Sequence, residues 1–77
     1  MKIYVLLKQN YDGSDTVCVS EDINVIRKSV CIDLNPSEDY PELEIWENGV
    51  EIYKTTGNNV LKKVADEIKI LDKVQEN

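Results

Sequence analysis

Residues 42–55, ELEIWENGVEIYKT, decide the fold, because apolar and polar residues alternate on both sides of Asn48-Gly49. This dipeptide tolerates the positive φ angles of a two-residue type I′ turn, so the stretch predicts a β-hairpin. Counting outward from the turn pairs Trp46 with Glu51 and Ile45 with Ile52. Directly opposed residues share a face of the hairpin. We therefore expect an apolar face of Leu43, Ile45, Val50 and Ile52, and an acidic face of Glu44, Trp46, Glu51 and Tyr53.

The length of the chain predicts one domain, residues 1–77. A chain of this size buries only about 60–65% of the surface that its unfolded form exposes, so it has room for one thin core. A sheet packed against helices in two layers is the natural solution. Phe is absent, so we expect the core to consist mainly of Ile, Val and Leu.

The composition is acidic, with 15 Asp and Glu against 9 Lys and Arg and a formal charge of −6. This balance argues against direct binding of nucleic acid and against docking on an anionic membrane, since both need clustered bases. It suits a soluble protein or one that meets a basic partner. No stretch approaches the ~20 apolar residues of a membrane span or the pattern of a signal peptide. We therefore expect a cytoplasmic protein.

The two cysteines, Cys18 and Cys31, are expected to be reduced and packed as small apolar groups, as is usual in a reducing compartment. A disulfide between them is the alternative, if the strand and the helix that carry them lie close together.

The first half of the chain predicts two strands and a helix. In the strand at 2–9, one side holds Ile3, Val5 and Leu7, and the other holds Tyr4, Leu6 and Lys8. A turn at 10–15 leads into a return strand at 16–19. We expect Ser20 to cap a helix that ends at Asn35-Pro36. Its apolar stripe comprises Ile23, Ile26, Val30 and Leu34, with Val25 and Ile32 outside it.

The second half predicts a linker, the hairpin and a second helix. The linker is 37–41, and Asn58 or Asn59 can cap the helix. Residues 73–77 are expected to fray. The core-facing side of the second helix is predicted to hold Val60, Leu61, Val64, Ala65, Ile68 and Leu71. Its solvent side is predicted to hold Lys62, Lys63, Asp66, Glu67 and Lys69, with Lys63 and Glu67 an i,i+4 pair and Ile70 off the stripe.

These elements predict an α+β fold of order ββαββα, in which an antiparallel sheet packs against two helices. With both helices on one face, the opposite face would carry Tyr4, Leu6, Trp46 and Tyr53. Such an exposed, partly apolar surface usually contacts something. The alternative is that a helix or the 37–41 linker folds over it.

The opening MKIYVLLKQNYDGSDTVCVSEDINVIRKSV resembles the start of many small phage and Firmicute proteins, and PELEIWENGVEIYK is similar in style to their second half. Those proteins begin with a K-[IV]-Y-V strand, turn through an Asp/Gly-rich loop, form a second strand and enter a capped helix. The resemblance implies this fold and a phage or mobile-element origin. It implies no catalytic residues.

Catalysis is not expected from this composition. The chain has no histidine, which removes the usual imidazole base and the Ser-His-Asp and Cys-His nucleophile systems. Two cysteines thirteen residues apart do not make a zinc site, and the three glycines are isolated turn positions. Asp12 and Asp15 match only part of a calcium loop, and turn chemistry explains them better. We therefore expect neither an enzyme nor a metal or cofactor site.

The acidic and basic residues are distributed unevenly along the sequence. Between Lys28 and Lys54 there is no base, and all seven charged residues there are acids: Asp33, Glu38, Asp39, Glu42, Glu44, Glu47 and Glu51. These carboxylates could face a basic groove on a partner, or they could be an ordinary solvated face that also protects edge strands.

The leading hypothesis is therefore a small, acidic, non-enzymatic binding protein that docks an acidic hairpin face on a basic site of another protein. Combined with the resemblance, the hypothesis is that this protein inhibits a host nucleic-acid-handling or defence protein. The alternatives are a homo-oligomeric structural or assembly protein that buries its open sheet face, and a binder of small ligands. The predicted partner-binding residues are Glu42, Glu44, Trp46, Glu47, Glu51 and Tyr53.

Overall fold

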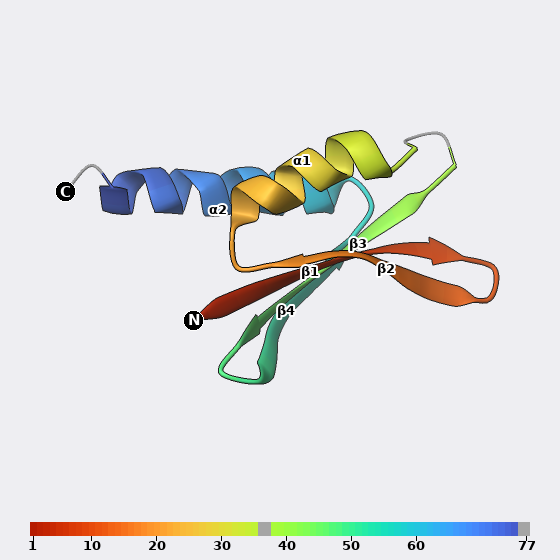
Figure 1. Cartoon of the computed structure of the whole chain (residues 1–77), viewed down its shortest axis with the longest axis horizontal. Coiled ribbons are helices and arrows are strands. Elements are labelled where there is room, and N and C mark those ends of the chain that lie inside the picture. The colour runs from red at the N-terminus through yellow and green to blue at the C-terminus, as the bar shows by residue number, and fades with distance from the viewer. Residues whose placement is uncertain (36–37, 76–77) are drawn as a thin grey trace.

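The computed structural model describes residues 1–35 and 38–75, which form one four-stranded antiparallel sheet and two helices. In Figure 1 both helices lie on the same side of the sheet. The strand order is β2-β1-β3-β4. The predicted α+β fold of order ββαββα is therefore confirmed. The elements are β1 (Lys2–Asn10), β2 (Gly13–Ser20), α1 (Ile23–Asp33), β3 (Tyr40–Glu47), β4 (Val50–Thr56) and α2 (Asn59–Gln75).

The core lies between the sheet and the helices. On the sheet side, Tyr4 pairs with Ile45 and Leu6 pairs with Leu43, and all four side chains are buried. The expectation that Tyr4 and Leu6 lie on the uncovered face is therefore wrong. Both sides of β1 are apolar, so alternation alone does not show which one the helices cover. The buried apolar residues are Tyr4, Leu6, Ile23, Ile26, Leu34, Leu43, Ile45, Val60 and Val64.

The turn between β3 and β4 is formed as predicted. Asn48 and Gly49 both have positive φ, 53° and 81°, as a type I′ turn requires. The predicted pair of Trp46 with Glu51 is also present.

Farther from the turn, a register shift makes the pairing of β3 with β4 differ from the predicted one. Between Ile45 and Trp46 the ladder is irregular, and Ile45 pairs with Tyr53 instead of Ile52. One extra residue on β4, as in a β-bulge, moves every later side chain of that strand to the other face. The expectation that Val50 and Ile52 join the core is wrong, because they are 62% and 50% exposed.

Helix α1 begins two residues later than predicted. The Asp22 side chain is the N-cap and accepts a hydrogen bond from the Asn24 amide at 2.9 Å. The Ser20 hydroxyl accepts from the Asp22 amide at 3.0 Å, so it supports the cap from outside the helix. The predicted stripe is confirmed in Ile23, Ile26 and Leu34, which are buried, and in Val30, which packs against them. Val25 and Ile32 are exposed, as expected from their place outside the stripe.

Helix α2 buries a narrower stripe than its sequence predicts. Val60 and Val64 are in the core, and Ile68 and Leu71 pack against it. Leu61 and Ala65, which were expected to face the core, are exposed. Ile70 is exposed, as predicted. Glu67, which was expected on the solvent side, is buried instead.

The remaining expectations concern the cysteines and the loops. Both thiols are free: Cys18 packs against the core, but Cys31 is exposed, which the sequence did not predict. The expected linker at 37–41 overlaps β3, which already begins at Tyr40, while residues 36–37 lie outside the described part. Helix α2 continues through Gln75, and residues 76–77 of the expected frayed end also lie outside it.

Within residues 1–35 and 38–75, neither helix has the length and apolar character needed to cross a membrane.

Candidate protein-binding face

The side of the sheet that faces away from both helices is the candidate site. On this side Ile3 pairs with Trp46, Val5 with Glu44 and Leu7 with Glu42. Each is the neighbour of a core residue, so alternation directs it away from the helices. We call this surface the open face. It carries Ile3, Val5, Leu7 and Gln9 from β1, Ser14, Thr16 and Val19 from β2, Tyr40, Glu42, Glu44 and Trp46 from β3, and Glu51 and Lys54 from β4.

The structure brings together four of the six residues predicted to bind a partner: Glu42, Glu44, Trp46 and Glu51. The other two predictions, Glu47 and Tyr53, do not belong to this surface. Glu47 pairs with Lys2 on the helix-covered side of the sheet.

Tyr53 faces helix α2 because of the register shift in β4. Its ring lies beneath the Lys63 ammonium, with 4.5 Å between Nζ and the ring centroid. This cation–π contact joins β4 to the helix. The expected pair of rings, Trp46 and Tyr53, is therefore divided between the two faces of the sheet.

Tyr40 is the second ring of the open face, and the sequence interpretation missed it. Its hydroxyl lies 3.4 Å from Thr56 Oγ1, and its ring packs against Gly57. A Cβ at Gly57 would come within 2.9 Å of the Tyr40 hydroxyl, so glycine permits this approach. The alternation of Trp46 and its predecessors, continued backward, reaches Tyr40, but the linker expected at 37–41 includes this residue.

Strand β1 adds an apolar row that was expected to face the core. Ile3, Val5 and Leu7 run beside the carboxylates of β3. No local signal in the sequence indicates this orientation, since Tyr4 and Leu6 are equally suited to a core. The open face therefore combines apolar side chains, two rings and three carboxylates with one lysine.

Lys54 holds two of these carboxylates. Its Nζ lies 3.0 Å from Glu42 Oε1 and 3.9 Å from Glu44 Oε2. The hydrogen bond to Glu42 and the charge of that group raise the pKa of Lys54 above its ordinary value. Glu44 also accepts a hydrogen bond from Trp46 Nε1 at 3.0 Å, which fixes the indole ring on the surface.

A pocket of about 440 Å³ opens beside this ion pair. Gly13 and Ser14 of β2 line it together with Lys54 of β4. These strands are the two edges of the sheet, so the pocket extends across the open face from one edge to the other. Glu42 lies in the same pocket, where its side chain is only 6% exposed.

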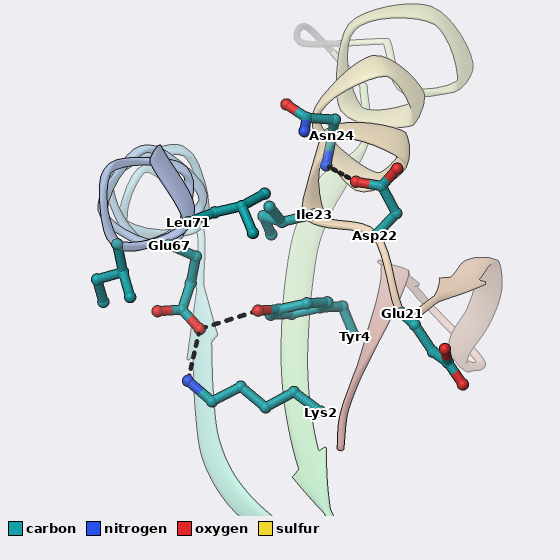
Figure 2. Close-up of a pocket in the computed structure, with 9 residues that line it drawn as sticks. Lys2, Tyr4, Glu21, Asp22, Ile23, Asn24, Glu67 and Leu71 are labelled. Atoms are coloured by element: carbon teal, nitrogen blue, oxygen red, sulfur yellow. Dashed lines mark hydrogen bonds and ion pairs between the residues drawn. The ribbon is translucent and has the colours of Figure 1, made fainter. Parts of the chain in front are cut away.

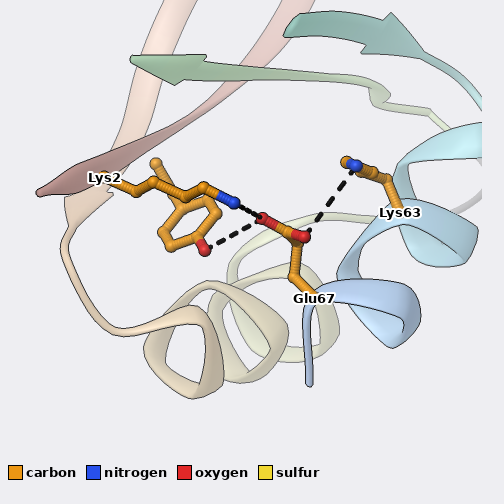
Figure 3. Close-up of polar contacts among 4 residues, drawn as sticks. Lys2, Lys63 and Glu67 are labelled. Carbon is orange, nitrogen blue, oxygen red and sulfur yellow. Dashed lines mark hydrogen bonds and ion pairs between the residues drawn. The ribbon is translucent and has the colours of Figure 1, made fainter. Parts of the chain in front are cut away.

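A second polar cluster lies on the opposite side of the sheet, around Glu67. Its side chain is 2% exposed, and Figure 3 shows it pointing from α2 toward β1. Tyr4 donates a hydrogen bond to Glu67 Oε1 at 3.1 Å, and Lys2 Nζ lies 3.2 Å from the same oxygen. Lys63 Nζ lies 3.8 Å from Oε2, so the predicted i,i+4 pair is confirmed. Burial first, and then the charge of Glu67 and its hydrogen bond, raise the pKa of Tyr4 to about 12.

Figure 2 shows Lys2, Tyr4 and Glu67 at one wall of a pocket of about 520 Å³ between the helices and the start of β1. The Glu67 carboxylate is directed at Tyr4 and Lys2 rather than into open space. Its charge is already met by two lysines and a phenol, so the cluster holds α2 against β1. In the described ranges, no three Cys, Asp or Glu side chains are grouped in a way that could hold a metal ion.

Comparison of the chain with protein-family models, curated proteins and solved structures finds no match in any of the three.

Proposed function

We propose that this protein is a small non-enzymatic binding protein that docks its open face on a basic surface of a protein partner. The observation that carries the proposal is that both helices cover the same side of the sheet. On the uncovered side, Ile3, Val5 and Trp46 share a face of the sheet with Glu42 and Glu44 of β3. Aromatic and apolar anchors beside charged groups are typical of interface hot spots.

The size and charge of the molecule agree with this use. One side of a standard interface covers ~800 Å², roughly a seventh of the 5409 Å² accessible surface of this chain. The formal charge of −6 favours the approach of a basic partner. Glu42, Glu44 and Glu51 share the open face with a single base, Lys54.

The proposal that the protein is not an enzyme rests on its side-chain chemistry. The chain contains no histidine, and of the two most buried glutamates Glu67 is paired with two lysines and Glu42 with one. The resemblance to small phage and Firmicute proteins supports a finer proposal. In this form, the partner is a host protein that handles nucleic acid or takes part in defence, and the present protein inhibits it by covering its basic site.

The test is affinity capture from a host lysate with three versions of the protein. The open-face variant carries Ile3→Lys and Glu51→Lys, both at exposed positions. The matched control carries Leu61→Lys and Asp66→Lys on α2, with the same change of charge and the same kinds of replacement at exposed positions. Circular dichroism is used to check that each variant is folded.

We expect the wild type and the α2 control to retain the same basic protein, and the open-face variant to lose it. Equal capture by all three proteins would contradict the proposal, as would a captured partner without a basic surface.

A homo-oligomer is the second candidate, because α1 exposes two apolar side chains. Val25 and Ile32 line a pocket of about 270 Å³ together with Cys18. Two copies could bury these groups against each other. Light scattering at high protein concentration should then give twice the mass of the chain, and a monomer would refute this candidate.

A further inference from the structure

We infer that helix α1 pairs with α1 of a second copy of this chain, in a parallel arrangement about a two-fold axis. In this dimer Val25 and Ile32 contact their counterparts, and Lys28 of each copy pairs with Asp33 of the other. The inference goes beyond the proposed function, because α1 and the open face lie on opposite sides of the sheet (Figure 1). Each copy of the dimer therefore keeps its open face free for a partner.

The first argument is the position of the exposed apolar side chains on the two helices. Val25 and Ile32 are seven residues apart, so they form a stripe along one side of α1. Among the described residues of α2, the large exposed apolar side chains are Leu61 and Ile70. These two are nine residues apart and point to opposite sides of their helix. A second helix can therefore cover both side chains of α1 at once, but not both of α2.

The second argument is the hollow beside this stripe. Val25 and Ile32 line a pocket of about 270 Å³ between α1 and β2, together with Cys18 and Ser29. Ser29 lies midway between the two apolar residues and is buried, so it leaves room for a side chain of a facing helix. Paired helices interlock by placing side chains of one helix into such holes of the other.

The third argument is the balance of charge along α1. The whole chain has a formal charge of −6, which opposes contact between two copies. Helix α1 carries Arg27 and Lys28 against the single acid Asp33, so it lacks this excess of acid. A second copy is therefore not repelled at α1 as it would be at the open face.

The spacing of the charges determines the orientation of the pair. In the seven-residue repeat of paired helices, lettered a to g, Val25 and Ile32 both fall on d, Lys28 falls on g and Asp33 on the following e. In a parallel pair, g of one helix lies beside the following e of the other, so Lys28 and Asp33 form two ion pairs across the axis. An antiparallel pair would instead bring like charges together. Ser29 Oγ donates to Asp33 Oδ2 at 2.6 Å, which holds this carboxylate beside the stripe.

The first experiment measures the mass of the protein by sedimentation equilibrium, at concentrations up to about 1 mM because weak association requires them. The wild type is compared with Ile32→Glu and with its matched control Ile70→Glu, which makes the same change at an exposed position on α2. Circular dichroism is used to check that the variants are folded.

We expect the wild type to dimerise with a Kd on the order of 100 µM, because one helix per copy makes less contact than a standard interface. Ile70→Glu should dimerise like the wild type. Ile32→Glu should weaken dimerisation by about tenfold or more, because a carboxylate then replaces an apolar contact.

The second experiment tests the orientation by exchanging the charges. Lys28→Glu and Asp33→Lys should each remain monomeric, because each puts like charges at the facing positions. An equimolar mixture of the two should dimerise like the wild type, since a base then faces an acid at both contacts. Lys62→Glu and Asp66→Lys make the same changes at exposed positions of α2, and each should dimerise within about threefold of the wild type.

A wild type that stays monomeric at about 1 mM would overturn the inference, as would equal weakening by Ile32→Glu and Ile70→Glu. Dimers of Lys28→Glu alone, or a mixture with Asp33→Lys that stays monomeric, would overturn the parallel pairing. None of these results bears on the capture test of the open face, so the two proposals can fail separately.

Discussion

Two glutamates are buried on opposite sides of the same sheet, and their surroundings differ. Glu67, between α2 and β1, is held by Tyr4, Lys2 and Lys63, which come from both layers of the fold. Glu42, on the open face, is held by a half-exposed lysine that also serves a second carboxylate. Glu67 thus has two lysines and a phenol as partners, whereas Glu42 shares one lysine with Glu44. The first joins the two layers of the fold, and the second lies on the face that we propose to bind a partner.

Among the polar side chains, the largest expected effect comes from removing the Glu67 carboxylate. Glu67→Ala leaves the buried Tyr4 hydroxyl and the two lysines without their acceptor, and should lower the free energy of unfolding by about 2–3 kcal/mol. Chemical denaturation measures this loss. Glu51→Ala, at an exposed position, is the control and should stay within about 0.5 kcal/mol. A similar small change in Glu67→Ala would show that the cluster does not stabilise the fold.

The second expected effect is a loss of stability in alkali that depends on Tyr4. Its pKa is raised from 10.0 to about 12 in the folded protein. Folding therefore favours the neutral phenol, and this contribution is fully present below pH 10 and is lost as the pH rises toward 12.

Chemical denaturation across that pH range, with Tyr4→Phe for comparison, isolates the contribution. Lysine deprotonation affects both proteins, whereas the phenol titrates only in the wild type. The free energy of unfolding should thus fall more steeply in the wild type. Parallel curves for the two proteins would contradict the assignment.

The third expected effect is smaller and concerns the open face. Glu42→Gln should lower the free energy of unfolding by about 1 kcal/mol or less, because Lys54 can turn into water when its partner loses charge. Chemical denaturation beside Glu67→Ala tests the comparison directly. A loss of stability as large as that of Glu67→Ala would mean that Glu42 also stabilises the fold through its contacts.

The smallest expected effect tests the register that assigns residues to the two faces. Ile52→Ala should change stability by no more than about 0.5 kcal/mol, since this residue is the exposed extra residue of β4. Ile45→Ala, in the core, is the matched comparison and should cost about 2–5 kcal/mol. Equal losses of stability in the two variants would contradict the observed register and favour the predicted pairing of Ile45 with Ile52.

The sequence predicts the elements better than the faces. Alternation and the Asn48-Gly49 turn identify the hairpin, and helical spacing identifies the stripe of α1. The irregular step after Ile45 has no sequence signal, so simple alternation puts Tyr53 on the wrong side. Strand β1 is apolar on both sides, so its orientation depends on contacts with the helices that alternation does not encode.

The two glutamate sites show the same limit. The pair of Lys63 with Glu67 is predictable because it lies within one helical turn. The contacts of Glu67 with Tyr4 and Lys2 join opposite ends of the chain, and local spacing does not encode them. Glu42, Glu44, Trp46 and Glu51 are correctly grouped by the sequence because they depend only on the turn and on the part of the register next to it.

The most direct test of the central claim is a two-dimensional ¹⁵N NMR titration of the labelled protein with hexa-arginine. The indole N–H of Trp46 donates to Glu44 on the open face, so it reports occupation of that surface. We predict that the indole signal and the amides of β3 and β4 shift together, with those of α1 and α2 unchanged. Shifts confined to the helices, with the Trp46 indole unmoved, would contradict the account.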